Sequence, residues 1–202
     1  PVVNNEGQLV GVITADDVVH VIQEEAEEDF LRLGGVQEDD FYEAILQTTK
    51  SRFSWLLVNL CTAIVASLVI GLFDAAIEQV VALAVLMPIV ASMGGNAGTQ
   101  TLTVAVRALA MKELTTTNAA RIVGKEVVVG GINGILFAVL IGLVTWAWFG
   151  DPTIGLIIGA AMIVNLLLAG FAGVTIPLVM QRLNIDPAIG SAVVLTTITD
   201  VV

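Results

Sequence analysis

Residues 127–181 read VVVGGINGILFAVLIGLVTWAWFGDPTIGLIIGAAMIVNLLLAGFAGVTIPLVMQ, and Asp151 is their single charged side chain. Asp151 separates two uncharged runs of 24 and 30 residues. A helix needs roughly 20 apolar residues to cross the ~30 Å hydrocarbon core of a bilayer. Two such runs joined by Gly-Asp-Pro predict an antiparallel pair of transmembrane helices, near 123–149 and 153–181.

The same pattern extends toward both ends of the chain. Uncharged runs cover residues 55–73 and 79–106, and a further apolar stretch follows Asp186. The short links at 74–78 and 150–152 make the helices beside them antiparallel hairpins. The sequence therefore predicts an all-α polytopic membrane protein with a transmembrane domain over residues 54–202. Its five transmembrane helices are expected near 54–73, 79–106, 123–149, 153–181 and 186–202, the last of them truncated.

The composition agrees with a membrane protein and argues against several other classes. Apolar residues make up 56% of the chain and charged residues 13%, about half the usual charged share of a soluble domain. The net charge is −11 and no basic stripe is present, so we expect membrane lipid and no nucleic acid among the partners. The chain contains no HExxH, GxSxG, P-loop or Cys–His pair, so we expect neither an enzyme nor an organic substrate.

The first 53 residues differ in character from the rest. Residues 1–14 predict two short strands around an Asn-Glu-Gly turn, and Asp16 and Asp17 suit the first turn of a helix. We interpret residues 1–19 as the tail of a soluble domain, because two strands and one helix opening cannot bury a core of their own. An acidic connecting segment over residues 20–53 then leads into the membrane.

Acidic side chains dominate this connecting segment. Residues 16–43 carry eleven acids against one base, Arg32. Gly34-Gly35 interrupts the stretch, so we predict a helix over about 16–33, a turn, and a second helix over about 39–53. Two interpretations stay open. The acids form a solvated face, or they bind divalent cations that neutralise them beside the negatively charged cytoplasmic leaflet.

The basic residues indicate an orientation. Apart from Arg32, they flank the expected transmembrane helices on one side only: before the first, between the second and third, and between the fourth and fifth. Lys and Arg are enriched in cytoplasmic loops. We therefore predict a multi-pass protein of the cell membrane with a cytoplasmic N-terminus and the C-terminal end of the chain outside. The residues that carry this pattern are Lys50, Arg52, Arg107, Lys112, Arg121, Lys125 and Arg182.

The second transmembrane segment is too polar for a plain lipid-facing helix. Gly94 and Gly98 stand four residues apart, which lets another helix approach closely. Asn96, Thr99 and Gln100 follow the spacing i, i+3 and i+4, so they share one face. These amides and hydroxyls either hold helices together or line a pore.

The fifth segment carries the second unusual polar position. Asp186-Pro187 opens it, and Asp200 lies ~21 Å further along the helix axis. Asn96 lies ~16 Å from Arg107 on the same scale, so Asn96 and Asp200 have similar depth. An acid inside a bilayer normally faces a cavity or pathway, unless Asp200 reaches the outer interface. Carboxylate, amide and carbonyl oxygens suit Mg²⁺ or Ca²⁺.

The sequence resembles the MgtE family of magnesium channels over essentially its whole length. The resemblance rests on Gly94-Gly-Asn-Ala-Gly-Thr-Gln100 in the second transmembrane segment, and on Asp186-Pro-Ala with Thr196-Thr-Ile-Thr-Asp200 in the fifth. Residues 1–22 look like the end of a second CBS domain. The acidic stretch from about His20 to Arg52 looks like the plug helix of that family.

The resemblance implies a Mg²⁺-selective channel or transporter that imports magnesium across the plasma membrane. It implies a homodimer with a central pore between the subunits, lined by helices two and five and closed when intracellular Mg²⁺ binds among CBS and plug-helix acids. Mg²⁺ would be both the transported ion and the regulatory ligand. By match to the family motifs, the pore and ion-binding residues are Asp200, the carboxylate for a hydrated Mg²⁺, Asp186 at the cytoplasmic mouth, Asn96, Gly94, Gly95, Thr99 and Thr196. The regulatory metal-binding acids are Asp17, Glu25, Glu28 and Asp29.

Two other classes of function stay open at this point. A secondary transporter of divalent cations, or of a cation-coupled solute, would show inverted repeats and paired broken helices. A membrane sensor that relays the state of the CBS domain without transport would need no pair of polar positions at one depth. Ion flux in proteoliposomes distinguishes all three.

Overall fold

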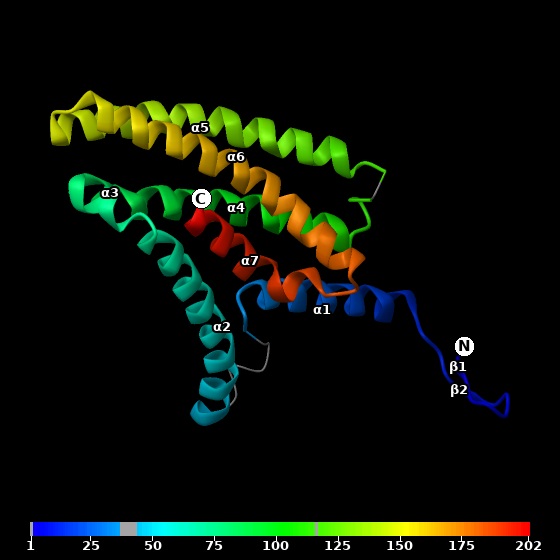
Figure 1. Cartoon of the computed structure of the whole chain (residues 1–202). Helices are drawn as coiled ribbons and strands as arrows, with labels where there is room; N and C mark the ends of the chain where they lie inside the picture. Colours follow the sequence, from blue (N-terminus) through cyan, green and yellow to red (C-terminus); the bar gives the residue numbers. More distant parts are fainter. Residues whose placement is uncertain (1, 37–43, 116) are drawn as a thin grey trace.

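A computed structural model of the chain describes residues 2–36, 44–115 and 117–202, apart from the side chains of Val3, Ala26 and Asp29. The described part contains a two-stranded hairpin and seven helices (Figure 1). In chain order these are β1 (Val2–Val3), β2 (Leu9–Gly11), α1 (Ala15–Leu33), α2 (Ile45–Gly71), α3 (Asp74–Gln79), α4 (Val81–Ala110), α5 (Ala119–Phe149), α6 (Pro152–Arg182) and α7 (Pro187–Val201).

Four of the helices, α2, α4, α5 and α6, are long and apolar enough to cross a membrane. The fifth expected segment forms α7, an apolar helix of 15 residues. The structure therefore confirms the predicted all-α polytopic membrane protein and places a helix in each of the five expected segments.

Two boundaries differ from the prediction. α2 begins at Ile45, nine residues before the expected start, because Gln47, Lys50 and Arg52 are good helix formers and no Gly or Pro interrupts them. The expected link over 74–78 is itself the short helix α3, whose Asp74 in the first turn favours a helix start. The second helix that we predicted before the membrane, over about 39–53, is therefore the first part of α2 from Ile45 onward. Residues 39–43 of that prediction lie outside the described residues.

The antiparallel pair α5–α6 forms the largest contact in the fold. Small residues let the two backbones meet. A Cβ atom added to Gly130 would lie 2.4 Å from the carbonyl oxygen of Leu166, and one added to Gly155 would lie 2.6 Å from that of Gly142. Close backbone approach through small residues is a usual way for membrane helices to pack.

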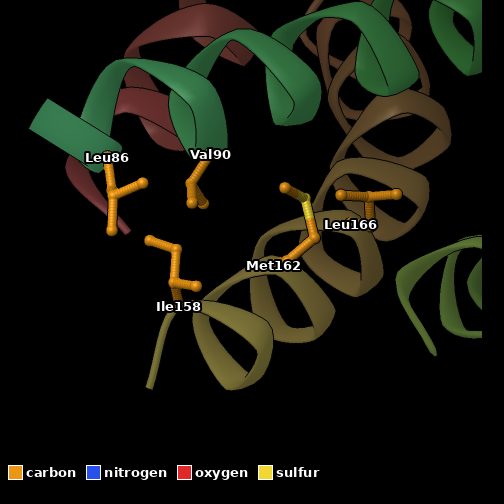
Figure 2. Close-up of a cluster of buried hydrophobic side chains, with 5 residues drawn as sticks. All are labelled: Leu86, Val90, Ile158, Met162 and Leu166. Carbon is orange, nitrogen blue, oxygen red and sulfur yellow. The ribbon is translucent and has the colours of Figure 1, made fainter. Parts of the chain in front are cut away.

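α6 lies at the centre of the membrane helices, between α5 on one side and α4 with α7 on the other. Figure 2 shows its contact with α4, in which Ile158, Met162 and Leu166 face Leu86 and Val90. These side chains are buried, and their packing holds α4 in place through van der Waals contact, the main attraction between helices in lipid.

α2 stands apart from the rest of the membrane helices. In Figure 1 it diverges from α5 and α6, and its main contact among the other helices is with α7. α1 lies beneath α7 and also touches α4. Leu33, at the end of α1, packs against a buried cluster that includes Leu102 and Ala188.

The N-terminal elements follow the sequence pattern. β1 and β2 pair antiparallel, and Gly7 in the connecting turn has a φ of 78°, which favours glycine. Thr14 then caps α1: its hydroxyl accepts from the backbone N–H of Asp17, and the Asp17 carboxylate accepts from the backbone N–H of Thr14 at 2.8 Å. The strands and the start of the helix are confirmed, whereas assignment to a CBS domain stays a prediction.

Candidate ion pathway

A stripe of polar side chains runs along the side of α4 that faces away from the packed helices. Its members recur at the spacing of one helix face, and all are exposed. The opposite side of α4 is buried through Gly94, Gly98 and Leu102. Polar side chains facing lipid are costly in a membrane, so this face requires water or another protein surface beside it. The stripe consists of Ser92, Asn96, Thr99, Gln100 and Thr103.

The two types of side chain in this stripe behave differently. The Thr99 and Thr103 hydroxyls donate to carbonyls one turn earlier in α4, each at 2.8 Å. Within the described residues, the side-chain amides of Asn96 and Gln100 have no hydrogen-bond partner. Their oxygens are therefore free to contact water or a hydrated ion.

Asp200 is exposed near the end of α7. This end of α7 lies beside the middle of α4 (Figure 1). A Cβ atom built on Gly95 would lie 3.9 Å from the Thr199 hydroxyl. Asn96 follows Gly95 and Asp200 follows Thr199 on helices that run in opposite directions, so a rise of ~1.5 Å per residue separates the levels of the amide and the carboxylate by less than one helical turn. Thr196, one turn before Asp200, is partly buried and bonds within α7.

Glycines 94 and 95 occupy different surroundings, although the sequence groups them together. Gly94 is buried against Asn165 of α6, whereas Gly95 is partly exposed toward α7. Asn165 is itself fully buried and was not singled out by the sequence reasoning. An amide in the middle of an uncharged run of 30 residues, far from the polar residues at its ends, is the signal that identifies it.

Asp186 sits at the start of α7, near the end of α4. One carboxylate oxygen accepts from the backbone N–H of Ala188 at 2.9 Å, which caps the helix. The other accepts from the guanidinium of Arg32, in α1, at 2.8 Å. Arg32 also pairs with Glu28 one turn earlier. Asp186, the acid predicted at the mouth of the pore, is thus the residue through which α1 is attached to α7 by an ion pair.

The acidic side of α1 faces a cavity of about 910 Å³ between α1, α2 and α7. Glu24, Glu25 and Glu28 line it, together with Ser54 and Trp55 of α2. Within the described residues, no three His, Cys, Asp or Glu side chains are grouped closely enough to hold a metal ion. Three carboxylates therefore line the cavity, but the described residues do not form a complete set of metal ligands there.

The other two predicted regulatory acids have different positions. Asp17 lies at the opposite end of α1 from Arg32 and belongs to the cap at Thr14. Hydrogen bonds from the backbone N–H and hydroxyl of Thr14 lower the pKa of this carboxyl below its ordinary value. The side chain of Asp29 lies outside the described residues. The structure therefore places Glu25 and Glu28 together, and Asp17 away from them.

The links between helices divide between the two ends of the molecule. The α4–α5 and α6–α7 links lie at the end nearest α1, whereas α3 and the α5–α6 link lie at the opposite end (Figure 1). Arg107 and Arg182 stand in the last turns of α4 and α6, at the first of these ends. The basic residues of these helices therefore share one end of the fold, which is the arrangement that the orientation argument requires.

Comparison with known proteins gives one family and several relatives. The family model MgtE, described as a divalent cation transporter, matches residues 87–202, a range that contains Asn96, Asp186 and Asp200. The magnesium transporter MgtE of Thermus thermophilus is 35% identical over 205 residues, which cover 100% of this chain and 45% of the relative. The magnesium transporter MgtE of Enterococcus faecalis is 34% identical over 99% of this chain and 44% of its own length.

A third relative, the magnesium transporter MgtE of Bacillus subtilis, is 32% identical over 100% of this chain and 45% of its own length. The chain thus spans less than half the length of the curated relatives that it matches. The family match covers most of α4, all of α5, α6 and α7, and most of the polar positions described above.

Proposed function

Because this chain belongs to the MgtE family of divalent cation transporters, we propose that it forms the membrane-spanning part of a magnesium channel or transporter. The observation that supports this proposal best is the exposed polar stripe of α4 at the level of Asp200. In a single copy of the chain, these polar groups lie exposed on a surface at the depth of the membrane, with no other protein surface against them. A water-filled path for a hydrated cation gives them suitable surroundings.

We infer that the pore lies between two copies of the chain. One copy supplies a single carboxylate at this level, and one carboxylate gives an ion at most two ligand oxygens. A second copy related by a twofold axis along the pore would add another carboxylate and another amide at the same depth. Asp200 and Asn96 of both copies would then surround the ion path, with α4 and α7 as its walls.

The chemistry of this face suits Mg²⁺ as the transported ion. Mg²⁺ prefers oxygen ligands and loses its water reluctantly, so it is commonly held through its hydration shell. Two carboxylates at one level repel each other, and a divalent cation relieves that repulsion better than K⁺ or Na⁺. The magnesium transporters to which the chain is similar are named for the same ion.

α1 supplies a means of control from the cytoplasmic side. Leu33 of α1 packs against buried residues of α4 and α7, and Arg32 of α1 forms an ion pair with Asp186 at the start of α7. Regulatory Mg²⁺ near Glu25 and Glu28 would reduce the repulsion among the acids and favour α1 in this position. The described acids do not form a complete metal site, so this regulation rests on charge neutralisation.

The proposal includes a topology. The end of the fold that carries α1 and the basic residues would face the cytoplasm, because Lys and Arg are concentrated in cytoplasmic links. Residues 1–19 would then continue a cytoplasmic CBS domain, and the end of α7 would lie toward the outside. The protein would import Mg²⁺ across the cell membrane as a homodimer.

Mg²⁺ flux of the full-length protein in proteoliposomes tests the function. A channel gives flux that follows the Mg²⁺ gradient and membrane potential without a counter-gradient of protons or Na⁺. Flux that requires such a counter-gradient would instead support a secondary transporter. No flux above protein-free vesicles, with the dimer intact, would contradict transport and support a sensor.

A further inference from the structure

We propose that Asn165 is a positioning residue that holds α4 and α7 at one register, so that Asn96 and Asp200 meet at the same level of the ion path. This inference rests on the proposed function, because it assigns α4 and α7 as the walls of the pore. Asn165 belongs to α6, which is not part of the polar face itself.

The side chain of Asn165 lies between the two proposed pore helices and is 1% exposed. Its amide nitrogen donates to the carbonyl oxygen of Val90 in α4 at 3.0 Å and to that of Thr199 in α7 at 3.2 Å. An amide nitrogen has two protons, so the two bonds use its full donor capacity. One side chain thus joins three helices.

The two accepting carbonyls stand close to the polar positions that matter for the pathway. Thr199 directly precedes Asp200, and Val90 lies six residues before Asn96. A shift of one residue along a helix changes height by ~1.5 Å and rotates the side chains by ~100°. Bonds that fix both carbonyls to one amide therefore restrict the movement that would turn Asp200 away from Asn96.

Gly94 provides the space for this amide. A Cβ atom added at Gly94 would lie 2.4 Å from the Asn165 amide oxygen and 2.5 Å from its nitrogen. Those distances are far below van der Waals contact, and the side chain that blocks them is buried. The first glycine of Gly94-Gly-Asn thus lets Asn165 lie against α4, whereas its neighbour Gly95 faces α7.

The amide oxygen of Asn165 is buried without a hydrogen-bond partner among the described residues. A buried polar atom without a partner is destabilising, so packing alone would favour an apolar side chain of similar size. The two donated bonds distinguish Asn165 from such a residue. The positioning role depends on these two donors, and Asn165→Asp leaves at most one of them, the O–H of a protonated carboxyl, with little change in volume.

The register of α4 against α7 is measurable without any transport assay. A Cβ atom at Gly95 would lie 3.9 Å from the Thr199 hydroxyl oxygen, whose place the sulfur takes in Thr199→Cys. Gly95→Cys and Thr199→Cys therefore bring two thiols close enough to be cross-linked by oxidation or by a short thiol-reactive reagent. In a cysteine-free background of the full-length protein, which includes Cys61→Ser, we expect rapid cross-linking within one subunit. Adding Asn165→Ala should slow it at least severalfold. Asn59→Ala is the matched control, since the Asn59 amide donates only within its own helix, to Trp55 at 2.9 Å.

Mg²⁺ flux tests the effect of Asn165 on function, in a protein that does not carry the two introduced cysteines. Asn165→Ala should lower Mg²⁺ selectivity over K⁺ at least severalfold while the dimer content stays unchanged. Asn165→Asp serves as the second variant and should have the same effect, also if Asn165→Ala does not fold. If the wild-type protein carries no Mg²⁺, the proposed function fails, yet the cross-linking arm still decides the role of Asn165.

A double variant separates positioning from packing. Gly94→Ala alone should lower thermal stability because its methyl group meets the Asn165 amide. Gly94→Ala with Asn165→Ala should recover stability, since the clash is gone, but should not recover cross-linking or Mg²⁺ selectivity. Wild-type cross-linking and selectivity in both Asn165→Ala and Asn165→Asp would overturn the proposal and leave Asn165 as a packing residue.

Discussion

The ion pair between Arg32 and Asp186 gives the sharpest prediction about α1. Asp186→Asn removes the charge that binds Arg32 but keeps a residue that is equally suited to cap α7. Arg32 retains Glu28 as a second partner. The substitution therefore weakens the attachment of α1 to α7 and leaves α7 itself intact.

The magnitude follows from the exposure of the pair. The two side chains are 37% and 31% exposed, so solvent screens the interaction and the scale of a surface ion pair applies, ~0.2–1 kcal/mol. Converted to an equilibrium constant, this is roughly a 1.4- to 5-fold increase in detachment of α1. The Mg²⁺ concentration that half-closes the pore should rise by a similar factor.

Hydrogen exchange of the full-length protein measures the detachment directly. Backbone amides at the end of α1 should exchange roughly 1.4- to 5-fold faster in Asp186→Asn. Asp151→Asn is the matched control, because Asp151 caps α6 before a proline in the same way, with the Thr153 N–H at 2.7 Å, at the opposite end of the fold.

A double-mutant cycle with Arg32→Gln completes this test. The double variant Arg32→Gln with Asp186→Asn should exchange no faster than Arg32→Gln alone, because Arg32→Gln already removes the ion pair with Asp186. Unchanged exchange at the end of α1 in Asp186→Asn, or an equal change in Asp151→Asn, would refute the idea that this ion pair holds the helix.

Three further predictions concern α1 and the topology. Neutralising Glu25, Glu28 and Asp29 together should keep Mg²⁺ flux high at cytoplasmic Mg²⁺ that closes the wild-type pore; closure at the wild-type concentration would make these acids a solvated face. Because hydrogen bonds lower the pKa of the Asp17 carboxyl, its ionised form stabilises the first turn of α1 at pH above the ordinary carboxyl pKa of 3.8, and this stabilisation is lost as the pH falls below that value. Hydrogen-exchange protection of the amides in this turn should therefore decrease at low pH in the wild-type protein and stay unchanged over the same pH range in Asp17→Ala. A cysteine introduced at Gly150 of a cysteine-free protein should react with an impermeant reagent from outside; reaction only after permeabilisation would reverse the topology.

The transmembrane helices could be predicted because their signal is local. Absence of charge over about 20 residues is enough to identify a helix that crosses a bilayer, and Gly155 and Gly159, which stand four residues apart, pack closely against α5. The ends of the helices were harder to predict, since charged residues mark the boundary of the membrane and not the boundary of the helix. α2 therefore begins earlier than the uncharged run that identified it.

Contacts between distant segments could not be predicted from local patterns. Arg32 and Asp186 are 154 residues apart, and nothing in either segment specifies that α1 lies beside the start of α7. The similar depth of Asn96 and Asp200 did follow from helix rise, because both distances were counted from the same side of the membrane. Asn165 was missed because its significance depends on two carbonyls in other helices.

Mg²⁺ selectivity of Asp200→Asn tests the proposed pore. The substitution keeps the size of the side chain and removes its charge from both copies. Flux of Mg²⁺ relative to K⁺ should fall by at least about tenfold, which corresponds to ~1.4 kcal/mol of lost ion binding, while dimer content and thermal stability stay at the wild-type level. Asp200→Glu, which keeps the charge and narrows the path, should retain more of the selectivity. Wild-type Mg²⁺ selectivity in Asp200→Asn would contradict the assignment of this carboxylate, and of α7, to the ion path.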